Sequence, residues 1–416
     1  MAEWPIRFVL GEHPLELLET DVVFVSPGVP LEIPLLVEAR RRGVPLSSET
    51  RLFVELCPAS IVGVTGSSGK TTTTTLVGEM LRASGQRAWV GGNIGRPLIE
   101  HLPEIAPTDR VVMELSSFQL EFFAPWAGEE GRGLSPAIAA VLNISPNHLD
   151  RHPSMAAYVA AKRQILLHQR ADDVAVLGFD NAETRALAGE CRGQVLFFSQ
   201  REVVAQGAFL RDEVVILRLG GDEQPVCAVS EIKLLGRHNV DNVLAACTLA
   251  GVAGADVEAI AAVATTFSGV EHRLELVREL NGVRWYNDSI ATSPERMVAA
   301  LRSFDAPIVL LAGGRDKHLP WSEAAALILR KVRHLVLFGE AVPIIDRAVA
   351  AERARTEAQD GPEIARVGTL DEAVAVAARV ARPGDVVLLA PGGTSFDAFR
   401  DFAERGEWFK ELVRRL

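Results

Sequence analysis

Val64-Thr65-Gly66-Ser67-Ser68-Gly69-Lys70-Thr71-Thr72 follows an apolar run at residues 61–64 and precedes a helical pattern at residues 76–81. This order predicts a buried strand, a glycine-rich loop and the start of a helix. In such a loop the backbone N–H groups and the helix N-terminus face one point, Lys70 adds a positive charge, and the Thr71 hydroxyl can reach Mg²⁺. The segment therefore predicts a site for a nucleotide polyphosphate, although a strict phosphate-loop pattern would place glycine at the position of Val64.

Outside this loop the chain alternates short β-branched runs with longer Ala/Leu-rich helical patterns, which is typical of parallel sheets flanked by helices. We therefore predict an α/β fold, with strands at residues 22–25, 61–64, 111–115, 139–144, 174–177, 308–311, 335–338 and 386–389. Alternating apolar residues between positions 199 and 233 predict an antiparallel excursion from the central sheet. We expect three domains, at residues 1–48, 49–269 and 270–416.

Composition limits the class of protein. The 416 residues are 48% hydrophobic and 23% charged, and the formal net charge of −11 argues against non-specific binding to nucleic acid. The chain has four widely separated cysteines without a CxxC pair, which suggests neither a disulfide framework nor a zinc site. No export segment opens the chain, and no uncharged run reaches the ~18 residues of a membrane span. We expect a cytoplasmic monomer that binds small anionic molecules.

Three predicted strands of the central part end in polar residues. Asn93 follows residues 88–90, Glu114 follows residues 111–113, and His148 lies shortly after residues 141–142. In open parallel sheets ligands bind beyond the carboxyl ends of the strands, so these side chains should lie near the phosphate loop. Mg²⁺ prefers oxygen ligands, so Thr71 and Glu114 can hold one ion, and Glu114 and His148 can share a second. Taken singly, Glu114 could equally be a strand-end charge and His148 a surface histidine.

Together these stretches resemble the Mur ligase family, the ATP-dependent amide ligases of peptidoglycan precursor synthesis. The resemblance runs from about residue 22 to the C-terminus, and its most specific string is Glu-Leu-Ser-Ser-Phe-Gln-Leu-Glu at residues 114–121. The other matching stretches are residues 26–28, 65–71, 91–95, 147–151, 161–162, 236–242, 272–273, 287–289 and 313–317. The 114–121 string and the tail at residues 391–402 point to the branch of the family that adds D-glutamate.

The resemblance implies an N-terminal Rossmann-like domain for the uridine nucleotide, a central ATP-binding domain with the phosphate loop, and a C-terminal Rossmann-like domain for the amino acid. It implies that ATP phosphorylates the carboxylate of UDP-N-acetylmuramoyl-L-alanine and that the amine of D-glutamate attacks the acyl phosphate. It also implies two Mg²⁺ ions. The catalytic residues implied are Lys70, Glu114, His148 and Lys162, and the metal ligands implied are Thr71, Glu114, His148 and Lys162.

Lys162 lies in a predicted helix at residues 154–168, where a lysine would ordinarily be a solvated surface side chain. The resemblance instead matches it to the family's carbamylated lysine, which forms with CO₂ and provides anionic oxygen atoms near the second Mg²⁺. Hard oxygen ligands make this role chemically reasonable. Composition alone does not predict it.

The resemblance assigns the remaining site residues by function. The residues expected around ATP are Gly66, Ser67, Ser68, Gly69, Lys70, Thr71, Thr72, Asn242, Arg273 and Asp288. The residues expected to contact the muramoyl substrate are Asn93 and Ser116, and those expected in the D-glutamate pocket are Thr292, Lys317, Ser395 and Phe402. The residues alone leave Lys317 open as a surface cation.

The chain departs from the family pattern at two places. Ile290 stands where the D-glutamate-adding branch commonly carries a lysine, so one cation near the phosphates is missing. Residues 7–25 resemble only the end of the uridine domain, with its last strands at residues 8–11 and 21–25, so we expect the first βαβ unit to be absent. Either the start was assigned at an internal methionine, or uridine is bound differently. The alternatives are a Mur-type or folylpolyglutamate-type ligase for another amino acid, or a catalytically weak nucleotide-binding homologue.

Overall fold

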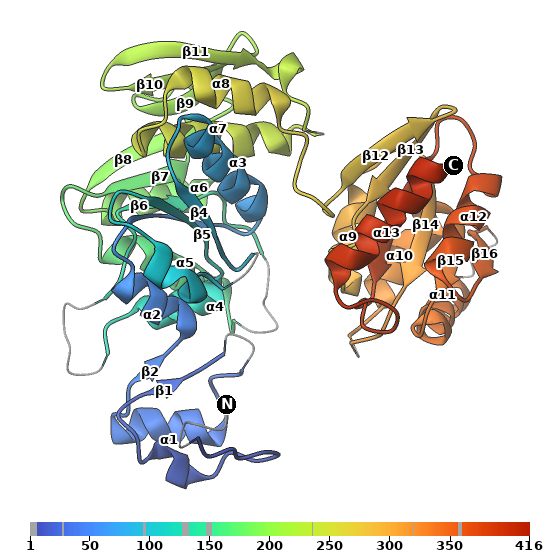
Figure 1. Ribbon diagram of the computed structural model, residues 1–416, viewed down its shortest axis with the longest axis horizontal. Coiled ribbons are helices and arrows are strands. Elements are labelled where there is room, and N and C mark those ends of the chain that lie inside the picture. The colour runs from blue at the N-terminus through green and yellow to red at the C-terminus, as the bar shows by residue number, and fades with distance from the viewer. Residues whose placement is uncertain are drawn as a thin grey trace. The chain divides into compact units, whose positions relative to one another are not determined.

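The computed structural model describes residues 6–26, 29–94, 97–126, 133–146, 152–234, 236–317, 319–356 and 360–416. The chain divides into two compact units, Met1–Phe267 and Ser268–Leu416 (Figure 1). Each unit is an α/β structure, as the alternating sequence pattern predicts. His148 lies outside the described residues.

A nine-stranded sheet forms the centre of the first unit. Its spatial order is β11-β10-β9-β8-β7-β6-β3-β5-β4, and neighbours are parallel from β4 through β9. The strands are β3 (Ser60–Thr65), β4 (Ala88–Gly92), β5 (Arg110–Glu114), β6 (Ile138–Val141), β7 (Val174–Gly178), β8 (Gln194–Ser199), β9 (Gly207–Arg211), β10 (Val214–Leu219) and β11 (Asp222–Ala228). Because β10 is antiparallel to both β9 and β11, the predicted antiparallel excursion is confirmed.

Helices cover both faces of this sheet. They are α2 (Glu49–Leu56), α3 (Lys70–Ala83), α4 (Ser117–Leu120), α5 (Met155–Leu167), α6 (Ala182–Ala186), α7 (His238–Val252) and α8 (Val257–Thr266), with 3₁₀ turns at Leu98–Glu104, Glu121–Phe123, Leu187–Glu190 and Val229–Glu231. Val62 and Val64 pack with α3, α7 and α8, whereas Ile61 packs with α2 and α5. Successive strand residues thus face opposite cores, which explains the nearly continuous apolar runs.

The N-terminal part of the first unit forms a small sheet of its own. It contains a 3₁₀ turn at Leu15–Leu18, β1 (Val23–Phe24), α1 (Pro34–Arg42) and β2 (Leu46–Ser47), and β1 and β2 pair in parallel. The strand predicted at residues 8–11 is wrong: this segment has no regular structure, and Phe8 and Leu10 are 71% and 87% exposed. A strand requires a hydrogen-bonded neighbour, and no described strand pairs with this segment.

The second unit is a six-stranded sheet in the order β12-β13-β17-β14-β15-β16. Its strands are β12 (Glu275–Leu280), β13 (Val283–Asn287), β14 (Ile308–Gly313), β15 (Val332–Phe338), β16 (Glu363–Arg366) and β17 (Val386–Gly392). All neighbours are parallel except β12 and β13. Its helices are α9 (Pro294–Arg302), α10 (Ser322–Lys331), α11 (Val342–Thr356), α12 (Leu370–Val380) and α13 (Phe402–Arg415). The first three pack on one face of the sheet and the last two on the other.

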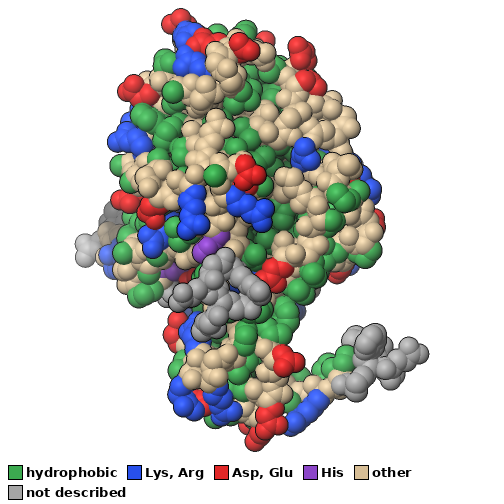
Figure 2. Space-filling model, turned by 90° about the vertical axis from the view of Figure 1, so that its left-hand side faces the viewer, with side chains coloured by type: hydrophobic (Ala, Val, Ile, Leu, Met, Phe, Trp, Pro, Cys, Tyr) green, Lys and Arg blue, Asp and Glu red, His purple; other side chains and the backbone are tan. Residues whose placement is uncertain are grey.

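The surface carries charges of both signs. Figure 2 shows one face, on which Lys and Arg side chains are interspersed with Asp and Glu among apolar and neutral surface. Within the described ranges, no helix combines the length and the apolar character needed to cross a bilayer.

The order of the nine strands determines where a ligand can bind. Strand β3 lies between β5 and β6. The chain leaves β3 through α3 toward β4 on one side, and leaves β6 through α5 toward β7 on the other. Ligands of open α/β sheets bind at such a reversal, beyond the carboxyl ends of the strands. The glycine-rich segment at residues 66–69 lies at this point, between β3 and α3.

The space around Gly69 shows how tightly this loop is packed. Its φ of +82° is in the left-handed region, and an added Cβ would lie 2.1 Å from Asn242 Oδ1. Gly85, just beyond the other end of α3, has a φ of +78° with nothing within 4 Å of an added Cβ. We expect Gly85→Ala to lower the free energy of unfolding by about 1–2 kcal/mol, the cost of the left-handed backbone. Gly69→Ala should lower it further, because Asn242 must also move.

Urea denaturation of the two variants and the wild type measures this difference. Equal losses in both variants would contradict the close packing of Asn242 against the loop.

Candidate active site

The glycine-rich segment at residues 66–69, called the phosphate loop below, folds around the ammonium group of Lys70. Lys70, the first residue of α3, donates to the carbonyl oxygens of Gly66 at 2.9 Å and Ser67 at 3.3 Å. The first-turn N–H groups of an α-helix lack partners within the helix, and they carry a partial positive charge. The loop thus presents a lysine and a helix N-terminus together, which is a site for an anion such as a phosphate.

Asn143, the second residue after β6, fixes the shape of the loop. Its backbone carbonyl accepts from Ser67 N at 2.9 Å, and its Oδ1 accepts from Ser68 N at 2.9 Å. Its Nδ2 donates to the Ser68 carbonyl at 3.2 Å. Asn143 is not among the predicted site residues. Its place directly beyond a buried strand was the signal that could have identified it.

Glu114 links two predicted site residues at the end of β5. The side chain is 3% exposed, and its oxygen atoms accept from Thr71 Oγ1 at 2.7 Å and from Asn93 Nδ2 at 2.8 Å. The structure therefore brings Thr71, Glu114 and Asn93 together beside the phosphate loop. A buried carboxylate and a hydroxyl are the hard oxygen donors that suit Mg²⁺. The donor set on this side fits a magnesium ion.

Lys162 is buried, so the expectation of a solvated surface lysine at this position is wrong. It is 2% exposed, and its Nζ donates to the Gly66 carbonyl at 2.9 Å and lies 4.6 Å from the centre of the Tyr158 ring. The helix α5 begins after Ser154, whose side chain accepts from Ala157 N, and this start directs Lys162 inward. Burial, with the nearby charge of Lys70, lowers the pKa of Lys162 to about 6, against the weaker opposing effect of Glu114.

Ser116 begins the short helix α4 next to this site. Its Oγ accepts from Gln119 N at 3.3 Å, and the Gln119 side chain accepts in turn from Ser116 N at 2.9 Å. This reciprocal capping box fixes the turn that follows Glu114. The buried His152 lies 2.9 Å from Ser117 Oγ and stacks on Phe118. The segment that begins at residue 152 is thereby attached to α4.

A pocket of about 180 Å³ opens beside the loop. It is lined by Leu142, Asn143, Gly178, Asp180, Asn181, Phe198, Asp241 and Asn242. Asn242 is 5% exposed and donates to Asn239 Oδ1 at 2.8 Å. Burial raises the pKa of Asp241, and the Asp180 carboxylate acts in the same direction. The pocket therefore places several hydrogen-bond acceptors next to the predicted phosphate site.

In the second unit, Asp288 follows β13 and is buried. Its Oδ1 accepts from Leu274 N at 3.1 Å. Burial raises the pKa of Asp288 to about 6, although this hydrogen bond and the charges of Arg273 and Arg296 lower it. Arg296 also donates to the carbonyl of Ile290 at 3.1 Å, so a cation lies next to the position where the family's lysine is missing.

The predicted D-glutamate residues lie beyond three strands of the same sheet. Lys317, after β14, donates to Thr292 Oγ1, after β13, at 3.3 Å. Ser395 is 2% exposed and follows β17. Phe402 begins α13, and its carbonyl accepts from Ser289 Oγ at 2.7 Å. The structure thus gathers the four residues at one edge of the second sheet.

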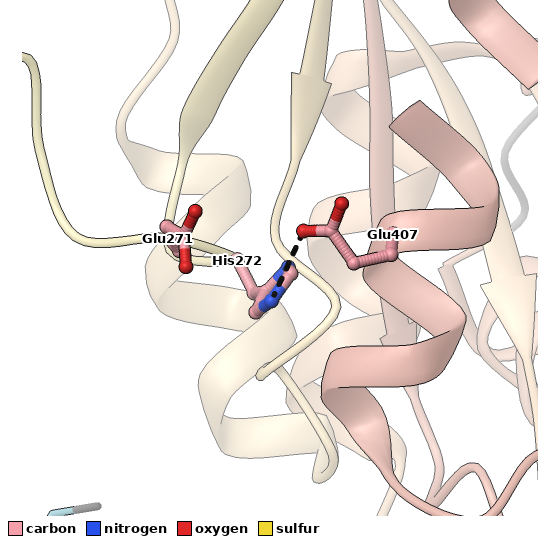
Figure 3. A group of neighbouring side chains, drawn as sticks. All are labelled: Glu271, His272 and Glu407. Carbon is pink, nitrogen blue, oxygen red and sulfur yellow. Dashed lines mark ion pairs between the residues drawn. The ribbon is translucent and has the colours of Figure 1, made fainter. Parts of the chain in front are cut away.

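A histidine and two carboxylates form a further cluster in this unit. Figure 3 shows His272 with Glu271 and Glu407, and His272 Nε2 lies 3.7 Å from Glu407 Oε1. Lys410 Nζ lies 2.7 Å from Glu407, 2.9 Å from Glu275 and 3.7 Å from Glu271. The ammonium group supplies the positive charge that these carboxylates require, so the cluster holds α13 to residues 271–275 without a metal ion.

The raised pKa of Asp288 predicts how stability depends on pH. Its folded pKa of about 6 exceeds its ordinary value of 3.8, so the folded chain binds more protons between these values. Stability therefore falls as pH rises through this window, by up to roughly 3 kcal/mol. Asp288→Asn removes this component, so between about pH 4 and about pH 7 the free energy of unfolding of the variant should change in the direction of higher stability relative to the wild type, by up to the same roughly 3 kcal/mol, as measured by urea denaturation. An identical pH dependence in both proteins would contradict the burial of an ionisable carboxyl.

Two family domains match this chain in order. The Mur ligase middle domain matches residues 64–250, and the Mur ligase, glutamate ligase domain matches residues 272–393. The UDP-N-acetylmuramoylalanine--D-glutamate ligase of Acetivibrio thermocellus is 47% identical over 412 residues, which cover 99% of this chain and 86% of that protein. The ligase of the same name from Symbiobacterium thermophilum is 48% identical over 419 residues, covering 100% and 89%.

Solved structures show the same fold at lower identity. The structure of UDP-N-acetylmuramoyl-L-alanyl-D-glutamate--2,6-diaminopimelate ligase has a TM-score of 0.57 and 17% identity, and covers 95% of this chain and 91% of that chain. MurF ligase from Thermotoga maritima, solved in complex with ADP, has a TM-score of 0.55 and 20% identity, and covers 88% and 84%. Since both domains match in chain order and two relatives are 47% and 48% identical to it over nearly its whole length, this chain belongs to the Mur ligase family.

Proposed function

We propose that this protein is the ATP-dependent ligase that joins D-glutamate to UDP-N-acetylmuramoyl-L-alanine in peptidoglycan precursor synthesis. The observation that carries the proposal is the convergence of Thr71, Glu114 and the buried Lys162 on the phosphate loop. Relatives that are 47% and 48% identical over nearly the whole of this chain bear the name of that ligase. We also propose that the enzyme acts in the cytoplasm as a monomer.

The reaction proceeds through an acyl phosphate. A carboxylate oxygen of the acceptor attacks the γ-phosphorus of ATP, and the bond to ADP breaks. The amine of D-glutamate then attacks the acyl carbon, phosphate leaves with that carboxylate oxygen, and the amine loses a proton. The activation is needed because a free carboxylate is a poor electrophile. The protein must neutralise the charge on the transferred phosphoryl group, which is the task of Lys70 and of the first-turn N–H groups of α3, at the end of the phosphate loop.

Magnesium ions would be held by Thr71, Glu114, His148 and Lys162, and would supply positive charge to the phosphates. The lowered pKa of Lys162 supports its carbamylation, because a largely neutral amine near pH 7 can attack CO₂ and release a proton. The product is an anionic carbamate in place of a buried cation. Asn93, which donates to Glu114, and Ser116, the N-cap of α4 two residues after Glu114, are proposed to contact the muramoyl substrate.

The nucleotide base is proposed to occupy the pocket beside the loop. Asn242 forms one wall of that pocket and also packs under Gly69. The hydrogen-bond acceptors that line the pocket suit a base that carries an exocyclic amine, as adenine does. Arg273 and Asp288 are proposed to complete the ATP site, and Thr292, Lys317, Ser395 and Phe402 to bind D-glutamate. Lys317 and the Thr292 hydroxyl support this assignment, because both can donate to a carboxylate.

The proposal predicts phosphate release that depends on both substrates. The wild type should release phosphate from ATP only when UDP-N-acetylmuramoyl-L-alanine and D-glutamate are both present. Replacing D-glutamate with L-glutamate, L-lysine or meso-diaminopimelate should abolish the release. Equal activity with one of these amino acids would contradict the assignment of D-glutamate.

Glu114 should matter for turnover more than for ATP binding, because its charge acts while the phosphoryl group is transferred. We expect Glu114→Gln to lower kcat by about a hundredfold or more, the size of effect seen when one charge-stabilising group is removed. Glu79→Gln is the matched control, since Glu79 is an exposed carboxylate paired with Arg82 on α3. A kcat for Glu114→Gln equal to that of the control would remove Glu114 from the site.

Lys162→Ala should be rescued by a small acid, because a bound carboxylate can replace the carbamate oxygens. We expect the variant to be nearly inactive and to regain part of its phosphate-release activity with acetate or formate. Lys233→Ala, which alters an exposed lysine of the same unit, should keep its activity and show no response. Full activity of Lys162→Ala without an added acid would exclude a role for the lysine.

A further inference from the structure

Arg405 is a fully buried cation in the second unit. It lies on α13, three residues after Phe402, and is 0% exposed. Among the residues that the structure describes, no carboxylate lies within the 4.0 Å ion-pair distance of its guanidinium group. Burying a charge without an ion pair is costly, and hydrogen bonds must offset the lost hydration. The partners of this guanidinium therefore indicate what it is for.

Those partners are neutral groups in the loops that follow two neighbouring strands. Arg405 Nε donates to Ser289 Oγ at 3.0 Å, and Nη2 donates to the Ser289 carbonyl at 2.9 Å. Nη1 and Nη2 both donate to the Gly393 carbonyl at 3.3 Å. Ser289 lies after β13 and Gly393 directly after β17. One side chain thus joins two loops that are 104 residues apart in the chain by numbering, 289 to 393.

A third loop packs against the same group. Gly314 directly follows β14, and a Cβ added there would lie 2.9 Å from Arg405 Nη1. The loops after β14 and β17 are also bonded to each other, since Arg315 N donates to the Thr394 carbonyl and Thr394 N to the Arg315 carbonyl, both at 2.8 Å. The guanidinium therefore lies at the meeting point of three loops.

These three loops carry the proposed amino-acid pocket. Thr292 lies three residues after Ser289, Lys317 three residues after Gly314, and Ser395 two residues after Gly393. Ser289 Oγ also donates to the carbonyl of Phe402, which connects the start of α13 to the same network. We propose that Arg405 is a positioning residue for the amino-acid substrate. It acts through the three loops and does not touch the substrate, and this inference rests on the proposed function.

The planar guanidinium is needed for its shape as well as its charge. Burial lowers the pKa of Arg405 only to about 10, so the group stays charged near neutral pH. A lysine would keep that charge, but its single nitrogen cannot reproduce a fork that reaches Ser289 and Gly393 together. Arg405→Lys therefore keeps the positive charge but removes the fork, so it tests the positioning role by itself.

The test compares two buried arginines. Arg51 is 1% exposed in the first unit, where it donates to the carbonyls of Phe122 and Ala124 and pairs with Glu55. Arg405→Lys and Arg51→Lys should both lower the melting temperature. We expect only Arg405→Lys to raise the KM for D-glutamate, by about tenfold or more, while the KM for ATP stays within about twofold.

A second, milder variant keeps the inference testable if Arg405→Lys fails to fold. Ser289→Ala removes the hydroxyl that connects Arg405 to Phe402 but keeps the backbone carbonyl. Its KM for D-glutamate should rise by about three- to tenfold, the value of one ordinary hydrogen bond. An unchanged KM for D-glutamate in both Arg405→Lys and Ser289→Ala would overturn the inference. So would an equal rise in Arg51→Lys, or an equal rise in the KM for ATP.

These outcomes are distinct from failure of the proposed function. Phosphate release by the wild type that does not require D-glutamate would overturn that function. Wild-type activity that requires D-glutamate, together with an unchanged KM for D-glutamate in both Arg405→Lys and Ser289→Ala, would overturn only the positioning role.

Discussion

The burial of one carboxylate, Glu114, is the constraint on which the arrangement of the phosphate site depends. A carboxylate that is 3% exposed needs donors or cations, and Thr71 and Asn93 donate to its two oxygens. Thr71 belongs to the first turn of α3 and Asn93 follows β4. The same side chain thus connects the end of β5 to α3, the helix that follows the phosphate loop, and to the neighbouring strand β4. The position of α3, and with it of Lys70, follows from this contact.

Two lysine side chains of this site lie close together at the Gly66 carbonyl. Lys70 and Lys162 both donate to the Gly66 carbonyl, and the charge of Lys70 helps to lower the pKa of Lys162. Two ammonium groups so close together repel each other, which favours the neutral form of the more deeply buried one. Carbamylation would convert this repulsion into attraction, because Lys162 would then carry a negative charge. The positions of the two lysines are therefore consistent with their different proposed roles: Lys70 as a cation beside the phosphates and Lys162 as an anionic carbamate.

The sequence was sufficient for the parts of the fold that depend on local pattern. Each predicted strand except the one at residues 8–11 overlaps an observed strand, and the excursion at residues 199–233 contains an antiparallel hairpin, because buried strands produce apolar runs and half-buried ones produce alternation. The phosphate loop was predictable because its glycines and its lysine lie within one short stretch of sequence. The placement of Glu114 beside Thr71 followed from the rule for strand ends, although the two residues are 43 positions apart.

Other features depend on packing that no local pattern contains. The helix pattern placed Lys162 at the surface, and only the fold shows that α5 turns this residue toward Gly66. Asn143 and Arg405 both bond to backbone groups of distant segments, and a backbone group carries no signature in the sequence. The strand predicted at residues 8–11 failed for a related reason, since a strand exists only with its neighbour. His148, predicted to complete the metal site, lies outside the described residues.

The central claim is that the acceptor's own carboxylate takes the phosphoryl group, and an isotope label tests it most directly. UDP-N-acetylmuramoyl-L-alanine labelled with ¹⁸O in its carboxylate would be incubated with the enzyme, ATP and D-glutamate, and the phosphate released would be analysed by mass spectrometry. The account predicts that each phosphate carries one labelled oxygen atom, because the acyl phosphate breaks between carbon and oxygen. Unlabelled phosphate, released alongside an amide product or without one, would contradict it.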